Sequence, residues 1–222
     1  MPIGLNITGE NSKVKSYNFV LGPISVNAYV LLPDNSDGAI LIDAPEGSAV
    51  QVLDFLRENK RTLSAVLLTH GHFDHAWECS LLKSKTNCKI YGHKEAEDVV
   101  LMQCKEGDFG YGIMPEMKLD YALKDGEKFE IDSVKFESIY APGHCAGSIM
   151  YYLPDEKRLF CGDVMFYESV GRYDLPTGNF GLLQKSIKSR IYTLPDDTEI
   201  FPGHGPETSV GHEKKFNPFI SA

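Results

Sequence analysis

The feature that most constrains this chain is a short segment in which three histidines and one aspartate fall within six residues: His70, His72, Asp74 and His75. The apolar run at 64–68 directly before it predicts a buried strand, and a helical pattern follows it. On an extended chain His70 and His72 share one face, whereas Asp74 and His75 come after a turn. Imidazole and carboxylate groups at this density suit a divalent metal ion, Zn²⁺ in particular. A histidine-rich loop without a metal is the alternative, but a chance match to these positions is improbable.

The pattern His-x-His-x-Asp-His after an apolar strand resembles the metal-binding signature of the metallo-β-lactamase superfamily. That signature continues with a histidine, an aspartate and a final histidine, which are matched by His144 in Ala-Pro-Gly-His, Asp163 in Phe-Cys-Gly-Asp and His204 in Pro-Gly-His-Gly. The family's upstream aspartate at a strand end is matched by Asp43. We expect Asp43 to orient a ligand imidazole, the alternative being an ordinary turn carboxylate. The motifs occur in the family's order and cover most of the chain.

The resemblance implies two divalent metal ions, with zinc the expected metal and iron or manganese the alternatives. The ligands of the first ion would be His70, His72 and His144. Those of the second would be Asp74, His75 and His204. Asp163 would bridge the two ions.

Such a centre predicts hydrolysis. A metal ion lowers the pKa of a water that it binds to about 7, so hydroxide forms at neutral pH, and it stabilises the oxyanion that develops on a carbonyl. Asp74 and Asp163, which would hold the ions, are the predicted catalytic carboxylates. No serine or cysteine nucleophile is required, and we expect Cys145 and Cys161 to be small buried residues. Two ions carry more charge than two carboxylates cancel, which favours anionic substrates.

Within the superfamily, the chain is most similar to compact glyoxalase II-like hydrolases, through Gly171-Arg172-x-Asp174 and through the segment around His204. The similarity implies hydrolysis of a thioester such as S-lactoylglutathione. Full-length glyoxalase II has a further helical domain that helps to hold glutathione, and this sequence ends before such a domain. We therefore predict that Arg172 binds a carboxylate of an anionic thioester. The alternative is a structural arginine tied to Asp174 or to a backbone carbonyl.

Two other functions are alternatives to the hydrolase. A mononuclear iron persulfide dioxygenase of the same fold would use His70, His144 and Asp163 and would consume O₂. The complete second set of ligands favours two metals instead. A metal-stabilised scaffold without catalysis is the third candidate, and a ligand set that leaves positions open for water and substrate argues against it.

Composition narrows the class of protein. The chain has 222 residues, of which 42% are hydrophobic and 24% charged, and this predicts one globular domain over 1–222. The net charge is -9 with no basic stripe, so we expect no nucleic-acid partner. No apolar run approaches the length of a membrane span. Five cysteines without a framework spacing, and no signal peptide, predict a cytoplasmic protein and count against β-lactam hydrolysis.

Periodicity alone predicts an α/β protein, and the resemblance implies an αββα sandwich. The predicted strands are 17–21, 25–32, 38–43, 64–68, 88–91, 134–140, 149–153, 159–160 and 198–201. The predicted helices run over 48–59 and 179–192, with others beginning near 76 and 93. Residues 104–118 contain three glycines and a proline, and we expect a mobile loop that could cover the substrate.

Overall fold

The first sheet of the computed structural model, which describes residues 5–6, 12–107 and 112–222, has seven strands that lie side by side in chain order. They are β1 (Leu5–Asn6), β2 (Val14–Leu21), β3 (Val26–Pro33), β4 (Gly38–Ile42), β5 (Thr62–Leu67), β6 (Lys89–His93) and β7 (Tyr121–Leu123). Pairing is antiparallel from β1 to β4 and parallel from β4 to β7. The parallel half brings the carboxyl ends of β4 and β5 to one edge, where α/β sheets place their sites.

The second sheet has six strands and is built from the later part of the chain. In spatial order they are β15 (Thr208–Ser209), β14 (Glu199–Pro202), β11 (Arg158–Gly162), β10 (Ile149–Leu153), β9 (Val134–Tyr140) and β8 (Lys128–Ile131). Strands β11 and β14 pair in parallel, so the residues after each of them reach the same edge. A small hairpin of β12 (Met165–Phe166) and β13 (Ser169–Val170) follows β11.

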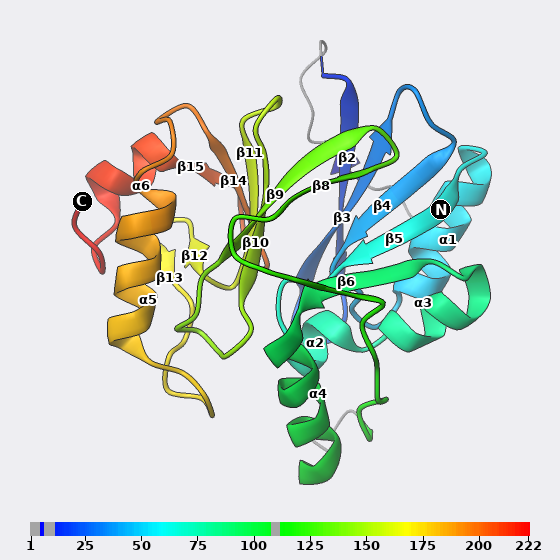
Figure 1. The fold of residues 1–222 in the computed structure, drawn as a ribbon, viewed down its shortest axis with the longest axis horizontal. Coiled ribbons are helices and arrows are strands. Elements are labelled where there is room, and N and C mark those ends of the chain that lie inside the picture. Colours follow the sequence, from blue (N-terminus) through cyan, green and yellow to red (C-terminus); the bar gives the residue numbers. More distant parts are fainter. Residues whose placement is uncertain (1–4, 7–11, 108–111) are drawn as a thin grey trace.

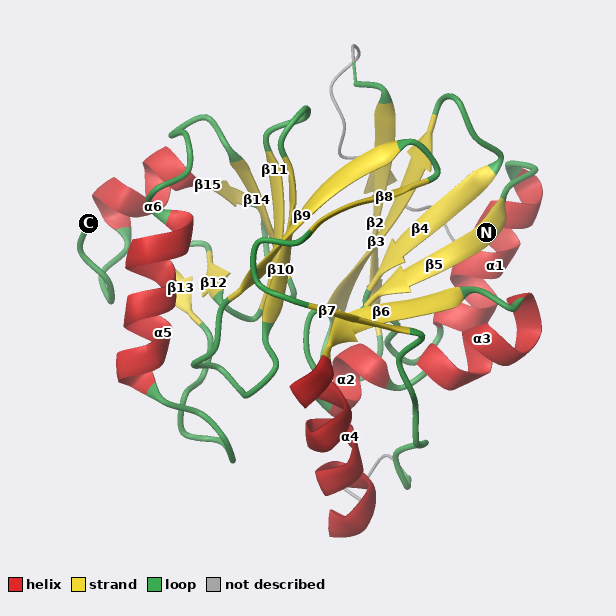
Figure 2. Ribbon diagram, in the orientation of Figure 1, coloured by secondary structure: helices red, strands yellow, loops and turns green. Residues whose placement is uncertain are grey.

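Helices cover the outer faces of the two sheets, as Figures 1 and 2 show. Helices α1 (Ser48–Glu58) and α3 (Cys79–Thr86) lie against the first sheet. Helix α5 (Phe180–Ser186), which continues into the π-helical turn η1 (Ile187–Ile191), and α6 (Val210–Phe216) lie on the side of the second sheet. Helices α2 (Phe73–Ala76) and α4 (Lys94–Glu106) lie at the edge where the strands of the first sheet end.

Three apolar clusters match these layers. The middle cluster fills the space between the sheets and includes Leu31, Phe136 and Tyr151, all of them almost fully buried. The two outer clusters lie under the helices; Leu56 of α1 belongs to one and Ile187 of η1 to the other. Burial of apolar surface on both faces of each sheet is what a four-layer sandwich requires. The αββα architecture predicted from the sequence is confirmed.

Two predictions about individual elements need correction. The helix predicted over 179–192 begins at Phe180 and loses its α-helical register at Ile187, where the π-helical turn starts. The loop predicted over 104–118 begins later, because 104–106 form the last turn of α4. Residues 108–111 lie outside the described part of the chain. Beyond them Met114 and Met117 are buried in the core under the first sheet, so this part of the loop packs against the protein body.

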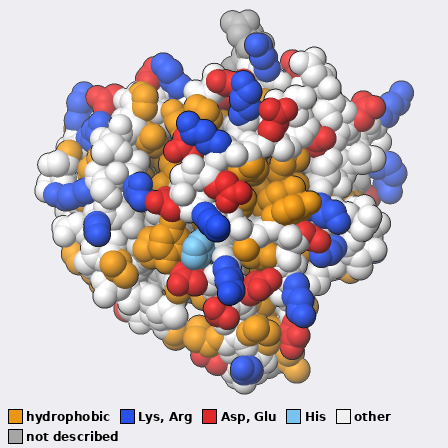
Figure 3. Space-filling view, in the orientation of Figure 1, with side chains coloured by type: hydrophobic (Ala, Val, Ile, Leu, Met, Phe, Trp, Pro, Cys, Tyr) orange, Lys and Arg blue, Asp and Glu red, His pale blue; other side chains and the backbone are white. Residues whose placement is uncertain are grey.

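The surface shows no segregation of charge on the face that Figure 3 presents. Lysine and arginine side chains there are interspersed with aspartate and glutamate. Among the helices that the structure describes, none combines the length and the apolar character needed to cross a membrane.

Candidate metal centre

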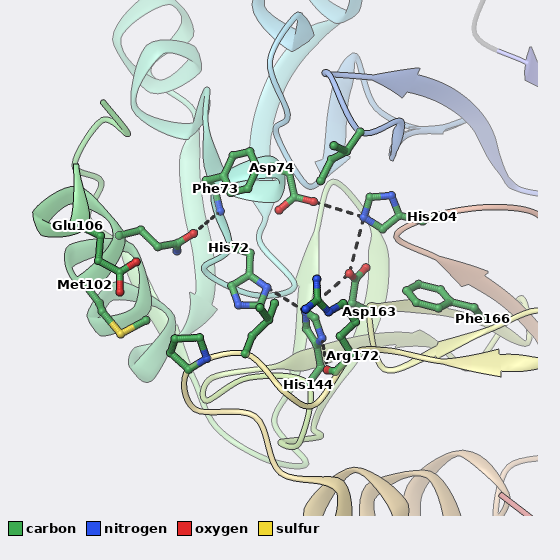
Figure 4. Close-up of a pocket in the computed structure, with 14 residues that line it drawn as sticks. His72, Phe73, Asp74, Met102, Glu106, His144, Asp163, Phe166, Arg172 and His204 are labelled. Carbon is green, nitrogen blue, oxygen red and sulfur yellow. Dashed lines mark hydrogen bonds and ion pairs between the residues drawn. The ribbon is translucent and has the colours of Figure 1, made fainter. Parts of the chain in front are cut away.

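The predicted ligands come together at the edge where strands of both sheets end. His70 and His72 follow β5, and the chain then enters α2, whose first turn carries Asp74 and His75. The sequence placed the helix start near residue 76, and the earlier start puts both ligands on one turn. The second sheet supplies the other three ligands, which follow β9, β11 and β14: His144, Asp163 and His204. Figure 4 shows the labelled members of this set pointing into one space.

The first predicted group is formed by three imidazoles. Nε2 of His144 lies 2.9 Å from Nδ1 of His72. The ring of His70 has its centroid 4.8 Å from that of His72 and 4.8 Å from that of His144. One nitrogen from each ring and Sγ of the neighbouring Cys145 lie within 4.8 Å of one another. The three histidines expected for the first ion are therefore within reach of a single ion.

The second predicted group is formed by Asp74, His75 and His204. Oδ2 of Asp74 lies 3.4 Å from Nε2 of His75 and 3.3 Å from Nε2 of His204. Asp163 lies between the two groups, because its Oδ1 is 3.4 Å from Nε2 of His75 and its Oδ2 is 3.6 Å from Nε2 of His144. Asp163 therefore contacts both groups, and the bridging role that the resemblance implies for it stays a prediction.

Several possible ligand atoms at the centre make no hydrogen bond within the described part of the chain. Nε2 of His70, Nε2 of His75 and Oδ1 of Asp163 are buried without a hydrogen bond. Burying an unpaired polar atom costs on the order of 1–3 kcal/mol, so three together at one place call for an explanation. A divalent cation bound by imidazole nitrogens and carboxylate oxygens satisfies all of them, and this donor set fits zinc, iron or manganese.

Hydrogen bonds behind the imidazoles fix their orientation. Nδ1 of His144 lies 2.7 Å from the carbonyl oxygen of Arg172, and since a carbonyl only accepts, Nδ1 carries the proton and Nε2 is left to bind a metal. Nδ1 of His75 lies 2.7 Å from Oδ2 of Asp43. Asp43 also accepts hydrogen bonds from the backbone N–H and the hydroxyl of Thr69, at 2.8 Å each. Its φ of 60° is a left-handed value that is uncommon for a residue other than glycine.

Burial and nearby charges shift the pKa values of the histidines at the centre in different directions. Burial lowers the pKa of His70 well below its ordinary value and lowers that of His72 to about 3, so both rings are neutral, as metal ligands must be. Burial acts in the same direction on His75, but the carboxylates of Asp74, Asp163 and Asp43 outweigh it and raise the pKa of that ring. Burial opposes the charged form of Asp163, yet the charge of His75 outweighs it and holds the pKa of Asp163 below the usual range. Asp74 and Asp163, whose pKa values are both lowered, thus keep their charge.

The centre forms the floor of a cavity of about 430 Å³. Its polar floor contains His72, Asp74, His144, Asp163 and His204. The walls are mostly apolar and are made by Ile24, Phe73, Met102, Phe166, Leu175 and Pro176. Gln103, Glu106 and Arg172 complete the lining, and Figure 4 shows the side chains that line the cavity.

Arg172 lines this cavity, but its guanidinium is paired with the neighbouring carboxylate of Asp174. Nε and Nη2 donate to the two carboxylate oxygens of Asp174, each at 3.0 Å, and both side chains are largely exposed. This pair is the structural alternative foreseen from the sequence. Binding of a substrate carboxylate by Arg172 stays a prediction.

Two glycines of the sequence motifs, Gly203 and Gly171, are needed for the close packing of the centre. A Cβ at Gly203 would lie 2.2 Å from Oδ1 of Asp163, and a Cβ at Gly171 would lie 1.8 Å from the carbonyl oxygen of Asp163. Both glycines directly precede a residue of the cavity, as Gly143 precedes His144. A glycine directly before a residue of the cavity is thus a pattern that recurs in the sequence and indicates close packing at the centre.

Comparisons with known proteins agree with this geometry. The model of the metallo-beta-lactamase superfamily matches residues 21–204. The chain is 33% identical to hydroxyacylglutathione hydrolase GloC of Haemophilus influenzae over 86% of this chain and 92% of that protein. It is also 33% identical to the probable metallo-hydrolase YqgX of Bacillus subtilis, over 90% of this chain and 95% of that protein.

Solved structures give the same result. The B3 metallo-beta-lactamase BLEG-1 superposes with a TM-score of 0.85 at 34% identity, covering 93% of this chain and all 100% of that one. TTHA1623 in a di-iron-bound form gives 0.79 at 32% identity, covering 92% and 100%. ETHE1 from Myxococcus xanthus gives 0.73 at 27% identity, covering 87% of this chain and 78% of that one.

Proposed function

Because this chain belongs to the metallo-β-lactamase superfamily, we propose that it is a binuclear metal-dependent hydrolase that cleaves an anionic thioester. The observation that carries the proposal is the complete donor set: three imidazoles in one group, two imidazoles and a carboxylate in the next, and Asp163 between them. Zinc is the metal we expect. The di-iron form of TTHA1623 supports iron as the alternative.

The ligands would be divided as the sequence predicts. His70, His72 and His144 would hold the first ion. Asp74, His75 and His204 would hold the second. Asp163 would contact both. When bound, two divalent ions would supply a nucleophilic hydroxide at neutral pH and Lewis-acid activation of a carbonyl.

The protein's own part is to orient the ligands and to shape the cavity above them. Asp43 holds the ring of His75, and the carbonyl of Arg172 holds that of His144, so each presents Nε2 to the centre. The apolar walls reduce access of bulk water to the reacting groups, which strengthens electrostatic interactions inside the cavity. Asp74 and Asp163 stay ionised at neutral pH because the pKa of each is lowered, and so they keep their charge for the ions.

A thioester substrate is supported by the likeness to GloC, whose name describes hydrolysis of hydroxyacylglutathione. The apolar walls suit the acyl and thiol substituents of such a molecule. Arg172 stands at the rim, where a substrate carboxylate could displace Asp174 from its guanidinium.

A mononuclear iron persulfide dioxygenase is the second candidate. The three residues it would use, His70, His144 and Asp163, are all present at the centre, and the likeness to ETHE1 is a reason to test for it. The complete group of Asp74, His75 and His204 favours the hydrolase, since one iron does not need it.

The deciding experiment combines metal analysis with a reaction carried out under argon and in air. The hydrolase is expected to carry two metal ions and to release thiol from S-lactoylglutathione equally fast in both gases. Hydrolysis of a β-lactam is measured alongside because of the likeness to BLEG-1. One iron per chain, with O₂ consumed on glutathione persulfide and no thioester cleavage, would replace the proposal with the second candidate.

A further inference from the structure

His204 is delivered by the second sheet, but much of its support comes from the first. It follows β14 and lies in the turn 202–205, beside the start of β3. The backbone N–H of Asn27 donates to the carbonyl of Gly203 at 2.7 Å. Val26 forms an isolated antiparallel bridge with His204 itself. The turn that carries this predicted ligand is therefore paired to a strand of the opposite sheet.

The side chain of Asn27 holds this turn on both sides of His204. Its Nδ2 donates to the carbonyl of Pro202 at 3.0 Å and to that of Gly205 at 2.8 Å. Its Oδ1 accepts a hydrogen bond from Nδ2 of Asn18 at 3.0 Å. Asn27 is buried, with only 2% of its surface exposed, and every polar atom of its amide is used. A carboxylate could not donate these bonds and a hydroxyl could donate only one, so the site selects an amide.

Two further contacts come from the same part of the first sheet. The hydroxyl of Tyr29 donates to the carbonyl of Pro202 at 2.7 Å. Nδ1 of His204 lies 3.2 Å from the carbonyl oxygen of Ser25, which leaves Nε2 facing Asp74 and Asp163. Ser25 has a left-handed φ of 61°, so the backbone before β3 is bent to present this carbonyl.

His204 needs this support more than its partner ligands do. Its side chain is 26% exposed, whereas that of His75 is 0% and that of Asp74 is 7% exposed. Packing fixes the buried ligands, but a partly exposed imidazole on a turn depends on hydrogen bonds for its position. The amide of Asn27 makes its hydrogen bonds to Asn18 and to the two carbonyls that flank His204. Its influence should therefore be local to one ion.

We propose that Asn27 is a positioning residue for the His204 side of the metal centre, so that it sets the affinity for the second ion and not for the first. This inference rests on the proposed two-ion function. In this arrangement a residue of the first sheet positions a ligand that follows a strand of the second sheet.

The test is a titration of metal-free protein with Co²⁺, followed by its absorption spectrum and by calorimetry. The wild-type protein is expected to bind two ions. In Asn27→Ala the second ion should bind about 10–100-fold more weakly, as for other residues that support a ligand from behind, and the first should bind as in the wild type. Asn18→Ala is the matched control, because it removes the other amide of the same hydrogen-bond pair and leaves both bonds to the turn in place.

A double variant separates positioning from general stability. In a His204→Ala background, Asn27→Ala should have no further effect on metal binding, because the ligand through which it acts is gone. If Asn27→Ala fails to fold, Tyr29→Phe removes one donor to Pro202 with a smaller disturbance, and it should weaken the second ion alone by a smaller factor. Unchanged affinity for both ions, or equal weakening of both, would overturn the role of Asn27. Wild-type protein that binds one ion only would instead contradict the proposed two-ion function.

Discussion

Oδ2 of Asp43 lies 2.7 Å from Nδ1 of His75, and both side chains are almost fully buried. The two residues come from the ends of neighbouring parallel strands, with Asp43 after β4 and His75 after β5 on α2. Their contact turns Nε2 of His75 toward Asp163. The carboxylate that the sequence predicts behind the centre therefore has a defined partner.

Replacing Asp43 by asparagine should weaken metal binding. The substitution keeps the size of the side chain but removes the charge that favours the orientation of His75, and we expect about 10–100-fold lower affinity in competition with a chelator. Asp120→Asn is the control, because Asp120 is a carboxylate of the same half of the chain that pairs with Lys83 away from the centre. Equal affinity of Asp43→Asn and wild type would show that Asp43 is only a turn residue.

Removing Asp163 should affect both ions, whereas removing His204 should affect one. Asp163 lies within 3.6 Å of imidazoles from each group, whereas the ion pairs of His204 are with Asp74 of the second group and with Asp163. Elemental analysis of Asp163→Ala and His204→Ala after equal dialysis checks this. A single iron in the wild type that survives His204→Ala would contradict two-metal binding.

Arg172→Lys should raise KM for an anionic thioester roughly tenfold or more, because an ammonium group cannot make the two parallel bonds of a guanidinium. Metal content and melting temperature should stay unchanged, since the side chain is exposed. A thioester without a carboxylate should be affected far less.

Asp174→Asn is the informative partner variant. It weakens the pair that occupies the guanidinium and should lower KM for the anionic substrate. If Arg172→Lys raises KM equally for charged and neutral thioesters, or lowers the melting temperature, then Arg172 supports the loop and not the substrate.

Alkylation should spare the two cysteines nearest the metal ligands. Burial raises the pKa of Cys145 and of Cys161 to about 12, so at pH 8 both remain protonated thiols inside the protein. Iodoacetamide should label Cys104, the one partly exposed thiol of the five, and mass spectrometry should find all five labelled after unfolding. Labelling of the native protein should leave thioester hydrolysis intact. Rapid loss of activity with modification of Cys145 would point to a thiol nucleophile.

Glu213 of α6 should matter for stability and not for metal. It is fully buried, and its carboxylate accepts hydrogen bonds from the backbone N–H of Glu168, the hydroxyl of Thr208 and the amide of Asn217. Glu213→Ala leaves these donors unpaired and should lower the free energy of unfolding by about 3 kcal/mol in urea. Exposed Glu207→Ala should change it little. Loss of metal from folded Glu213→Ala would show that α6 also supports the centre.

The fold class and the set of candidate ligands could be predicted because each depends on short local patterns. The apolar strand and the two histidines that follow it, His70 and His72, lie within a few residues of one another. His144 and His204 are each marked by a Pro-Gly pair directly before the histidine. The contact of Asn27 with Pro202 joins residues 175 positions apart, and no local pattern reports it. Asn27 lies inside the strand predicted over 25–32, and nothing near it in the sequence points to the turn of His204.

Other differences also come from tertiary contacts. Helical spacing of apolar residues predicts a single helix up to 192, because a π-helical turn keeps the same face buried while it adds a residue to the turn. The glycine content of 104–118 predicts a mobile loop. Met114 and Met117 are nevertheless buried in an apolar core, which is assembled from residues distant in sequence.

Neither sheet holds a complete set of ligands. Each candidate ion would draw ligands from both: His70 and His72 from the first sheet with His144 from the second, and Asp74 and His75 from the first with His204 from the second. Release of either ion would therefore require that ligands from both sheets let go of it. The rate at which a chelator removes metal from the protein should therefore depend on how often the two sheets move apart, as well as on the ligands themselves.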